Sequence, residues 1–502
     1  MTETGSASVL CATLRGIEAL PVTAEVNAAG GLPGLDVVGM PDSAVLEART
    51  RVKCAIRAAG FLLPRSRVTV SLAPGEMRKQ GTGFDLPMAV AILVATHQLP
   101  REVADGRLYV GELGLDGTVC PVRGDVAYAI LAEREGLELV TSAQSPLSAG
   151  WRGSTRAVAT LAQLKGGVED LPSLGWCQAA PVRPPVAAVP ALDFSDVVDQ
   201  ELAKRAMAIA AAGRHGMLMV GPPGSGKTML ARRLPTILPP LGEAEAAEAM
   251  LIHSVAGQPI EAIARGERPF RAPHHSVSVG GLVGGGSPVV LPGEISLAHA
   301  GVLFLDELPE FARNALQAMR QPLEDHEVRI VRAAGTYVFP CDFMLVAAAN
   351  PCPCGHLGDP GHECRCPPAR IVSYQARIGG PLMDRIDVVV DVARPSSKKV
   401  IAGQQGMSSA QMAADVARAR EFALWREARL GDDAPTDPVA RADLDAEASA
   451  AFEGMAERLA LGGRAIARVA RVARTIADMA EREQVGTDDI VEAIGFRSRS
   501  LG

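Results

Sequence analysis

Residues 221–228 have the spacing of a loop that binds phosphate. They read Gly-Pro-Pro-Gly-Ser-Gly-Lys-Thr, follow an apolar run and precede a helix-like segment. Glycines let such a loop curl its backbone N–H groups around a phosphate, while Lys227 reaches the terminal phosphates and the Thr228 hydroxyl binds Mg²⁺. The alternative is a Gly- and Pro-rich turn with a surface lysine. Such a turn does not require an apolar run before it and a helix after it. We therefore predict that a nucleotide is bound by Gly221, Pro222, Pro223, Gly224, Ser225, Gly226, Lys227 and Thr228.

Two adjacent carboxylates, Asp306 and Glu307, follow the apolar run 301–305. Asp306 would hold the Mg²⁺ shell, and Glu307 would orient and deprotonate an attacking water. By themselves the two acids could simply be solvated at the end of a strand. Following a phosphate-binding loop, they indicate a site that hydrolyses ATP with Mg²⁺.

Two further residues are candidates for the same chemistry. Asn350 ends the apolar run 343–348, where its amide could hydrogen-bond the water or the γ-phosphate; alternatively it forms a turn before Pro351. Arg385 precedes another apolar run and could act on the ATP of a neighbouring subunit. From the residues alone, an ion pair of Arg385 with Asp384 or Asp387 is favoured.

Four cysteines are arranged as two C-x-C pairs, namely Cys352, Cys354, Cys364 and Cys366. Four thiolates suit tetrahedral Zn²⁺, and the intervening loop is long enough to bring the pairs together. The alternative is reduced thiols packed beside the ATP site. His356 and His362 fit solvated or loop-capping residues better than ligands.

These side chains need a sheet that brings strand ends together. The wholly apolar runs 217–220, 301–305 and 343–348 are typical of buried parallel strands. They predict an α/β core over residues 192–395. From about 407 the chain has helical patterns, including 464–484, which predicts a helical lid over residues 396–502.

A Pro-rich stretch, residues 181–191, predicts a linker between this core and an N-terminal domain at 1–180. Within that domain we expect strands and helices to alternate. The expected strands are 68–72 and 108–110, and the expected helices are 42–59 and 87–97.

The composition of the chain restricts its cellular compartment more than it restricts its binding partner. The 502 residues are 48% hydrophobic and 21% charged, with a net charge of −7. No uncharged apolar run is long enough to span a membrane and no secretory signal is evident, so a cytoplasmic protein without a membrane partner is expected. The acidic balance does not exclude DNA, because a ring can line its pore with arginines.

The four ATP-site elements, in this order, resemble those of the YifB/ComM family of magnesium-chelatase-like AAA+ ATPases. The flanking stretches 210–215, 271–275 and 474–478 extend the resemblance along almost the whole chain. It implies a hexameric ring with ATP between subunits and Arg385 as the residue that acts in trans. It also implies that Arg464 is a sensor-2 arginine of the lid, rather than a solvated helix-end charge.

Two insertions resemble those of the chelatase branch. Residues 276–293 are rich in glycine, and residues 328–340 predict two short strands around an Ala-Ala-Gly turn. In related rings this hairpin faces the pore, where Arg329 and Arg332 would contact DNA phosphates without reading sequence. A surface hairpin with solvated arginines is the alternative.

Residues 65–141 resemble the proteolytic domain of Lon, which has a ribosomal-protein-S5-like α/β fold. Gly83 and Val126 stand where Lon has its catalytic serine and lysine, so neither a nucleophile nor a base is present. Thr82, next to Gly83, is typical of a turn. We therefore expect a binding or assembly domain rather than a peptidase.

Together these features predict an ATP-driven motor that translocates along or remodels DNA in recombination or transformation. Two other functions share the same ATPase core. One is the motor subunit of a magnesium chelatase, and the other is a protein-remodelling or regulatory ATPase that does not bind nucleic acid.

Overall fold

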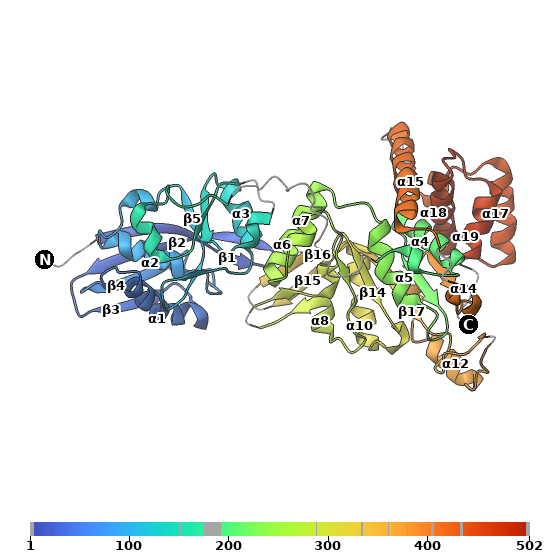
Figure 1. The fold of residues 1–502 in the computed structure, drawn as a ribbon, viewed down its shortest axis with the longest axis horizontal. Coiled ribbons are helices and arrows are strands. Elements are labelled where there is room, and N and C mark those ends of the chain that lie inside the picture. The colour runs from blue at the N-terminus through green and yellow to red at the C-terminus, as the bar shows by residue number, and fades with distance from the viewer. Residues whose placement is uncertain are drawn as a thin grey trace.

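The computed structural model describes residues 5–149, 153–174, 192–287, 289–332, 335–359, 361–378, 380–402, 406–431 and 435–497. An N-terminal α/β unit, a second α/β unit and a bundle of helices follow one another along the long axis of the molecule (Figure 1). The expected α/β class, with a parallel sheet and a helical C-terminal region, is confirmed. The predicted linker at 181–191 lies outside the described residues.

The N-terminal unit is built on a seven-stranded mixed sheet in the order β3-β4-β2-β1-β5-β8-β9. Its strands are β1 (Gly5–Arg15), β2 (Glu18–Ala29), β3 (Gly34–Val38), β4 (Arg67–Ala73), β5 (Arg107–Tyr109), β8 (Glu138–Ser142) and β9 (Thr155–Val158). Its helices are α1 (Ser43–Ala58), α2 (Asp85–Ala95) and α3 (Asp125–Arg134).

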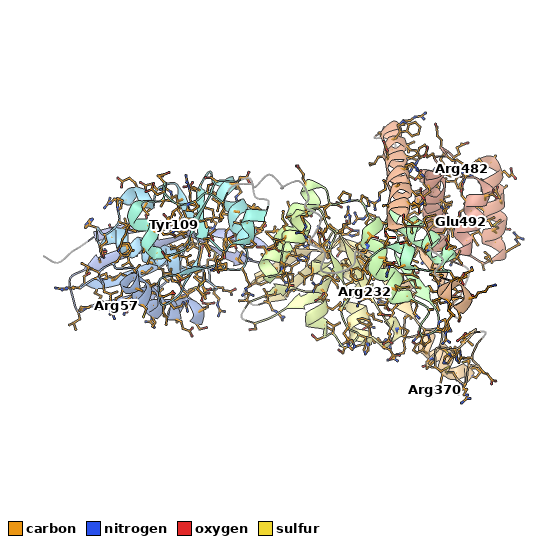
Figure 2. All side chains as sticks on the ribbon, viewed as in Figure 1. Arg57, Tyr109, Arg232, Arg370, Arg482 and Glu492 are labelled. Atoms are coloured by element: carbon orange, nitrogen blue, oxygen red, sulfur yellow. The ribbon has the colours of Figure 1, made fainter. Side chains whose placement is uncertain are left out.

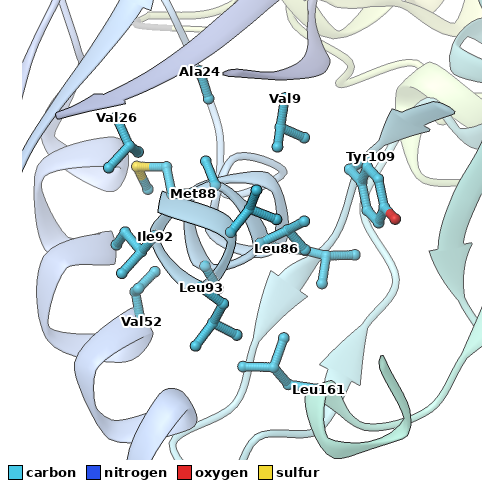
Figure 3. Close-up of a cluster of buried hydrophobic side chains, with 14 of the residues drawn as sticks. Val9, Ala24, Val26, Val52, Leu86, Met88, Ile92, Leu93, Tyr109 and Leu161 are labelled. Atoms are coloured by element: carbon cyan, nitrogen blue, oxygen red, sulfur yellow. The ribbon is translucent and has the colours of Figure 1, made fainter. Parts of the chain in front are cut away.

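Helix α2 forms the centre of this unit, and every one of its residues is buried. Its side chains pack between β1, β2 and α1, as Leu86, Met88 and Ile92 show in Figure 3. The first residue, Asp85, is a buried carboxylate that accepts hydrogen bonds from Arg51 at 2.6 Å and from the Leu113 N–H at 3.2 Å. A buried charge needs such partners, so this contact fixes where the helix begins.

The second unit contains a five-stranded parallel sheet in the order β11-β14-β17-β10-β18. Its strands are β10 (Met217–Val220), β11 (Phe270–Arg271), β14 (Val302–Leu305), β17 (Met344–Ala349) and β18 (Val388–Asp391). Every residue of β10, β14 and β17 is buried, as expected for a parallel sheet covered on both faces. Helices α4 (Glu201–Gly213) and α5 (Lys227–Arg233) pack on this sheet, and α6 (Glu243–Ala256) contacts α3 of the N-terminal unit.

The two insertions lie side by side on the part of this unit that faces the N-terminal unit (Figure 1). Strands β15 (Glu327–Arg332) and β16 (Gly335–Pro340) pair antiparallel, which confirms the expected hairpin. The glycine-rich segment contains α8 (Val279–Val283) and two short strands, β12 (Gly284–Gly285) and β13 (Leu291–Pro292).

The C-terminal helices are α15 (Ser409–Leu430), α16 (Pro438–Ala442), α17 (Ala446–Arg458), α18 (Gly463–Met479) and α19 (Thr487–Gly495). The helix predicted to reach residue 484 ends earlier, at Met479. Beyond it Glu481 adopts a left-handed φ of 53°, and the Arg474 guanidinium donates to the carbonyls of Arg482 and Glu483. Since those carbonyls are turned back toward α18, they cannot continue the helix. Within the described residues, no helix is long and apolar enough to cross a membrane.

Candidate nucleotide site

Three parallel strands end side by side and bring the predicted site residues together. The loop 221–226 follows β10, Asp306 and Glu307 follow β14, and Asn350 follows β17, which lies between the other two strands. The register pairs Val220 with Ala349 and Leu305 with Ala347, so the strands end at nearly the same level. The carboxyl ends of such strands are a common location for ligand sites in α/β proteins.

Lys227 is the first residue of α5 and points back into the loop. Its ammonium donates to the carbonyls of Gly221 at 2.7 Å and Pro222 at 3.0 Å, and to Asn350 Oδ1 at 3.2 Å. Burial lowers the pKa of Lys227, although the nearby carboxylates of Asp306 and Glu307 act in the opposite direction. A phosphate would exchange these neutral acceptors for charged ones and strengthen the contact.

The Thr228 hydroxyl donates a hydrogen bond to Asp306 Oδ2 at 2.6 Å. Hydroxyl and carboxylate oxygens are ligands that suit Mg²⁺. The two oxygens come from different strand–helix units, and they lie close enough to share one ion. The residues present therefore fit the magnesium that the sequence predicts.

Glu307 has a strained backbone and a half-exposed side chain. Its φ is 52°, in the left-handed region that residues other than glycine rarely adopt. Its Oε2 lies 3.5 Å from Nδ1 of His275, whose ring lies against those of His274 and Phe311. The carboxylate is thus held at the mouth of the site by an imidazole from the segment that leads into the first insertion.

His275 and Gln200 are site residues that sequence reasoning missed. His275 lies in the stretch 271–275, which served only as a mark of family resemblance. Gln200 donates to the carbonyls of Ser225 at 3.3 Å and Ala393 at 2.7 Å, which ties the start of α4 to the phosphate-binding loop. A single glutamine outside any motif carries no sequence signal for this role.

Arg385 lies away from these groups and pairs with Glu324. The ion pairs that the residues alone favoured, with Asp384 or Asp387, do not form. Asp384 accepts from Arg464 at 2.9 Å, and Asp387 binds Arg471 at 2.8 Å. These carboxylates face the α18 arginines because Arg385 and its neighbours lie in the turn before β18, where successive side chains diverge.

Arg464 lies in the first turn of α18 with 83% of its side chain exposed. Among the described residues, neither Arg464 nor Arg385 forms a hydrogen bond or ion pair with Lys227, Thr228 or Asp306. The chain by itself thus assembles the phosphate loop, the acidic pair and Asn350, while the two arginines lie outside that set.

The four cysteines form one cluster directly after Asn350. The Sγ atom of Cys352 lies 3.4 Å from that of Cys354 and 3.6 Å from that of Cys364, and Cys354 lies 3.7 Å from Cys364. With Cys366 included, all four sulfurs lie within 4.8 Å of one another. Tetrahedral zinc with bonds of about 2.3 Å needs sulfur–sulfur separations of about 3.8 Å, so the cluster fits this ion.

A second group in the same loop, His356, Asp359 and His362, is less suited to a metal. Asp359 contacts both imidazoles, at 3.4 Å and 3.1 Å. However, the guanidinium of Arg394 lies 3.1 Å from His362 Nδ1 and 3.5 Å from the Asp359 carboxylate, and it would repel a cation. We interpret this group as the contact that closes the cysteine loop, in line with the expected loop-capping role of the histidines.

The cysteine loop also presses on the phosphate-binding loop. A Cβ at Gly355 would lie only 2.5 Å from Cδ of Pro223, so the Gly355 backbone packs directly against the ring of Pro223. Gly355 has a φ of 82°, which also favours glycine. The loop behind Asn350 therefore forms one wall of the nucleotide site.

Comparisons with known proteins agree with this arrangement. Consecutive parts of the chain match the families described as "Subunit ChlI of Mg-chelatase" over residues 24–145, "Magnesium chelatase, subunit ChlI" over 193–400 and "Magnesium chelatase, subunit ChlI C-terminal" over 406–497. The chain is 38% identical to competence protein ComM of Haemophilus influenzae, with 96% of both chains covered. It is also 38% identical to YifB of Escherichia coli, over 96% of this chain and 95% of that protein.

The chain therefore belongs to the YifB/ComM family of magnesium-chelatase-like AAA+ ATPases. Its similarity to the magnesium-chelatase 67 kDa subunit of Chlorobaculum parvum is more limited, with 29% identity over 32% of this chain. Family membership implies ATP and Mg²⁺ as ligands, and the site residues fit both.

The contact between Gly355 and Pro223 can be tested with a matched pair of substitutions. Gly355→Ala should weaken binding of a fluorescent ATP analogue by about 5- to 150-fold, because overpacking costs about 1–3 kcal/mol and displaces the phosphate-binding loop. Gly358→Ala is the control, since Gly358 has a similar φ of 75° but no atom within 4 Å of its Cβ position. Equal affinities for the two variants would show that the cysteine loop does not support the phosphate-binding loop.

Proposed function

We propose that this chain hydrolyses ATP with Mg²⁺. The hydrogen bond between Thr228 and Asp306, beside the Lys227 ammonium, carries the proposal, because it joins the two magnesium ligands next to the phosphate-binding cation. In this role Lys227 neutralises the terminal phosphates and Glu307 takes the proton of the attacking water. Asn350, which already contacts Lys227, orients the γ-phosphate or the water. His275 keeps the Glu307 carboxylate beside the site.

Arg385 and Arg464 take their roles from the ring that we propose for this family. Both guanidinium groups lie at the surface, Arg385 partly and Arg464 almost completely exposed. Exposed arginines can reach the ATP of an adjacent subunit or of a rotated lid. We therefore propose a homohexamer in which Arg385 stabilises phosphate charge in trans and Arg464 senses nucleotide from the lid.

Replacing Glu307 by Gln separates binding from hydrolysis. The Glu307→Gln variant should bind ATP as the unmodified chain does, but its turnover should fall by at least about 100-fold, because a general base typically contributes that much. Nucleotide binding and phosphate release measured on the same preparation provide the check. If turnover persists, Glu307 is not the base.

We further propose that the motor acts on DNA. Support comes from the relative named as a competence protein and from the β15–β16 hairpin, which carries Arg329 and Arg332. The chelatase motor is the weaker alternative, because the matched chelatase subunit covers only 32% of this chain. A protein-remodelling ATPase remains the second alternative, although both aromatic side chains of the hairpin, Tyr337 and Phe339, are buried rather than presented to a substrate.

The two hairpin arginines should differ in importance. Arg329 is already paired with Glu327 at 2.5 Å, whereas Arg332 has no such partner among the described residues. Single-stranded or branched DNA should raise ATP turnover, and Arg332→Ala should remove more of that increase than Arg329→Ala does. Turnover that is indifferent to DNA would favour the protein-remodelling alternative.

We propose that the N-terminal domain, residues 1–180, has the Lon-like fold without peptidase activity. Gly83 is closely surrounded, with Val110 Cγ1 3.2 Å from where a Cβ would lie. Val126 is buried and its N–H donates to the Ser254 hydroxyl at 3.2 Å. These positions support packing and docking rather than a nucleophile and a base.

We propose that the four cysteines hold a structural Zn²⁺ that stiffens the wall behind Asn350. Protein purified under reducing conditions without chelator should contain about one zinc per chain, since four thiolates form one tetrahedral site. Cys364→Ser should lose most of this zinc, whereas His362→Ala should retain it, because Arg394 disfavours a cation at the histidine group. An unmodified chain without zinc would contradict the proposal.

A further inference from the structure

The N-terminal unit docks on the ATPase core at two places, and the first lies between helices. The backbone N–H of Gly124, before α3, donates to the Ser254 carbonyl of α6 at 3.0 Å. The Ser254 hydroxyl accepts from the Val126 N–H, and Val255 is buried against the same cluster as Val126. This contact fixes the orientation of the unit relative to α6.

The second docking place is the tight turn between β1 and β2, which packs against the hairpin. Gly16 has a φ of 65°, and its Cβ position lies 3.6 Å from the Val338 carbonyl oxygen of β16. Ile17 packs against the hydrophobic cluster that contains Tyr337 and Phe339. In Figure 1 one end of β1 lies next to α6 and the β15–β16 hairpin. The turn is therefore held on the hairpin by apolar contact.

This docking carries the side chain of Arg15 to the end of the hairpin. The Nη2 atom of Arg15 lies 2.7 Å from where a Cβ at Gly335 would be. Gly335 is the residue that pairs with Arg332 across the hairpin. Consequently, a guanidinium from the N-terminal unit lies beside the strand position opposite Arg332.

Arg15 and Arg332 each carry a positive charge that no described residue neutralises. Both side chains are exposed, and in the described part of the chain neither forms an ion pair. Glu18, which pairs with Arg15 in the β1–β2 register, is not within ion-pair distance of it. By contrast, the charge of Arg329 is partly neutralised by its ion pair with Glu327. Two unpaired guanidinium groups on adjoining segments can contact successive phosphates of one strand.

We propose that Arg15 and Arg332 form one composite phosphate-binding surface, so that the N-terminal unit takes part directly in binding nucleic acid. This inference rests on the proposed DNA function and assigns a role to the N-terminal unit within it. The recognised group is the phosphodiester backbone, so the surface binds without sequence preference.

The test is binding of the full-length chain to a labelled oligothymidine, measured by fluorescence anisotropy at several salt concentrations. Arg15→Ala should weaken binding about three- to tenfold at low salt and reduce the slope of log K against log salt by about 0.7, as expected for one lost contact to a single strand. Arg15→Lys should retain most of the affinity. ATP turnover without DNA should be unchanged, because Arg15 is remote from the nucleotide site.

Arg57→Ala is the matched control, because Arg57 is exposed on α1 of the same unit, away from the hairpin (Figure 2). It should bind as the unmodified chain does. If Arg332→Ala weakens binding and Arg15→Ala does not, the composite surface is wrong while the DNA function stands. If the unmodified chain fails to bind the oligothymidine at low salt, the DNA function fails and the inference with it.

Discussion

The short contact between the Thr228 hydroxyl and the Asp306 carboxylate is the point around which the molecule is arranged. It requires β10 and β14 to end at the same level although β17 separates them. All three strands must then be parallel, buried and in register, which only a sheet covered on both faces allows. The wholly apolar sequences of these strands follow from that requirement. The same requirement places the acidic pair next to the phosphate loop and Asn350.

The cysteine loop that follows Asn350 has no regular secondary structure, but it is constrained by its contact with the nucleotide site. The cysteine cluster begins two residues after Asn350, and Gly355 contacts Pro223 of the phosphate-binding loop. An irregular loop has few hydrogen bonds to hold its shape; here the clustered cysteines lie at its start, and the contacts of Asp359 with His356 and His362 hold the part that follows. This explains why residues suited to a metal and residues suited to phosphate are neighbours here.

Besides its contact with α6, the N-terminal unit packs on the hairpin insertion rather than on the proposed ATP-binding residues. Its β1–β2 turn packs on β16, and the first insertion packs under β15, with Ile330 Cδ1 3.1 Å from the Cβ position of Gly284. That insertion begins after His275, which contacts Glu307. A continuous set of contacts thus runs from the proposed phosphate surface to the proposed base.

The sequence by itself determined the local elements and the chemistry of the nucleotide loop. Apolar runs, the Gly-Lys-Thr spacing and the paired acids are encoded over a few residues, and the strands lie within one or two residues of their expected bounds. The order of these motifs also determined the family. Only the tertiary structure decided contacts between distant segments, such as His275 with Glu307, Arg385 with Glu324 and Arg15 with Gly335. The physical reason is that periodicity and motif spacing report neighbours along the chain, whereas these pairs depend on how whole elements pack.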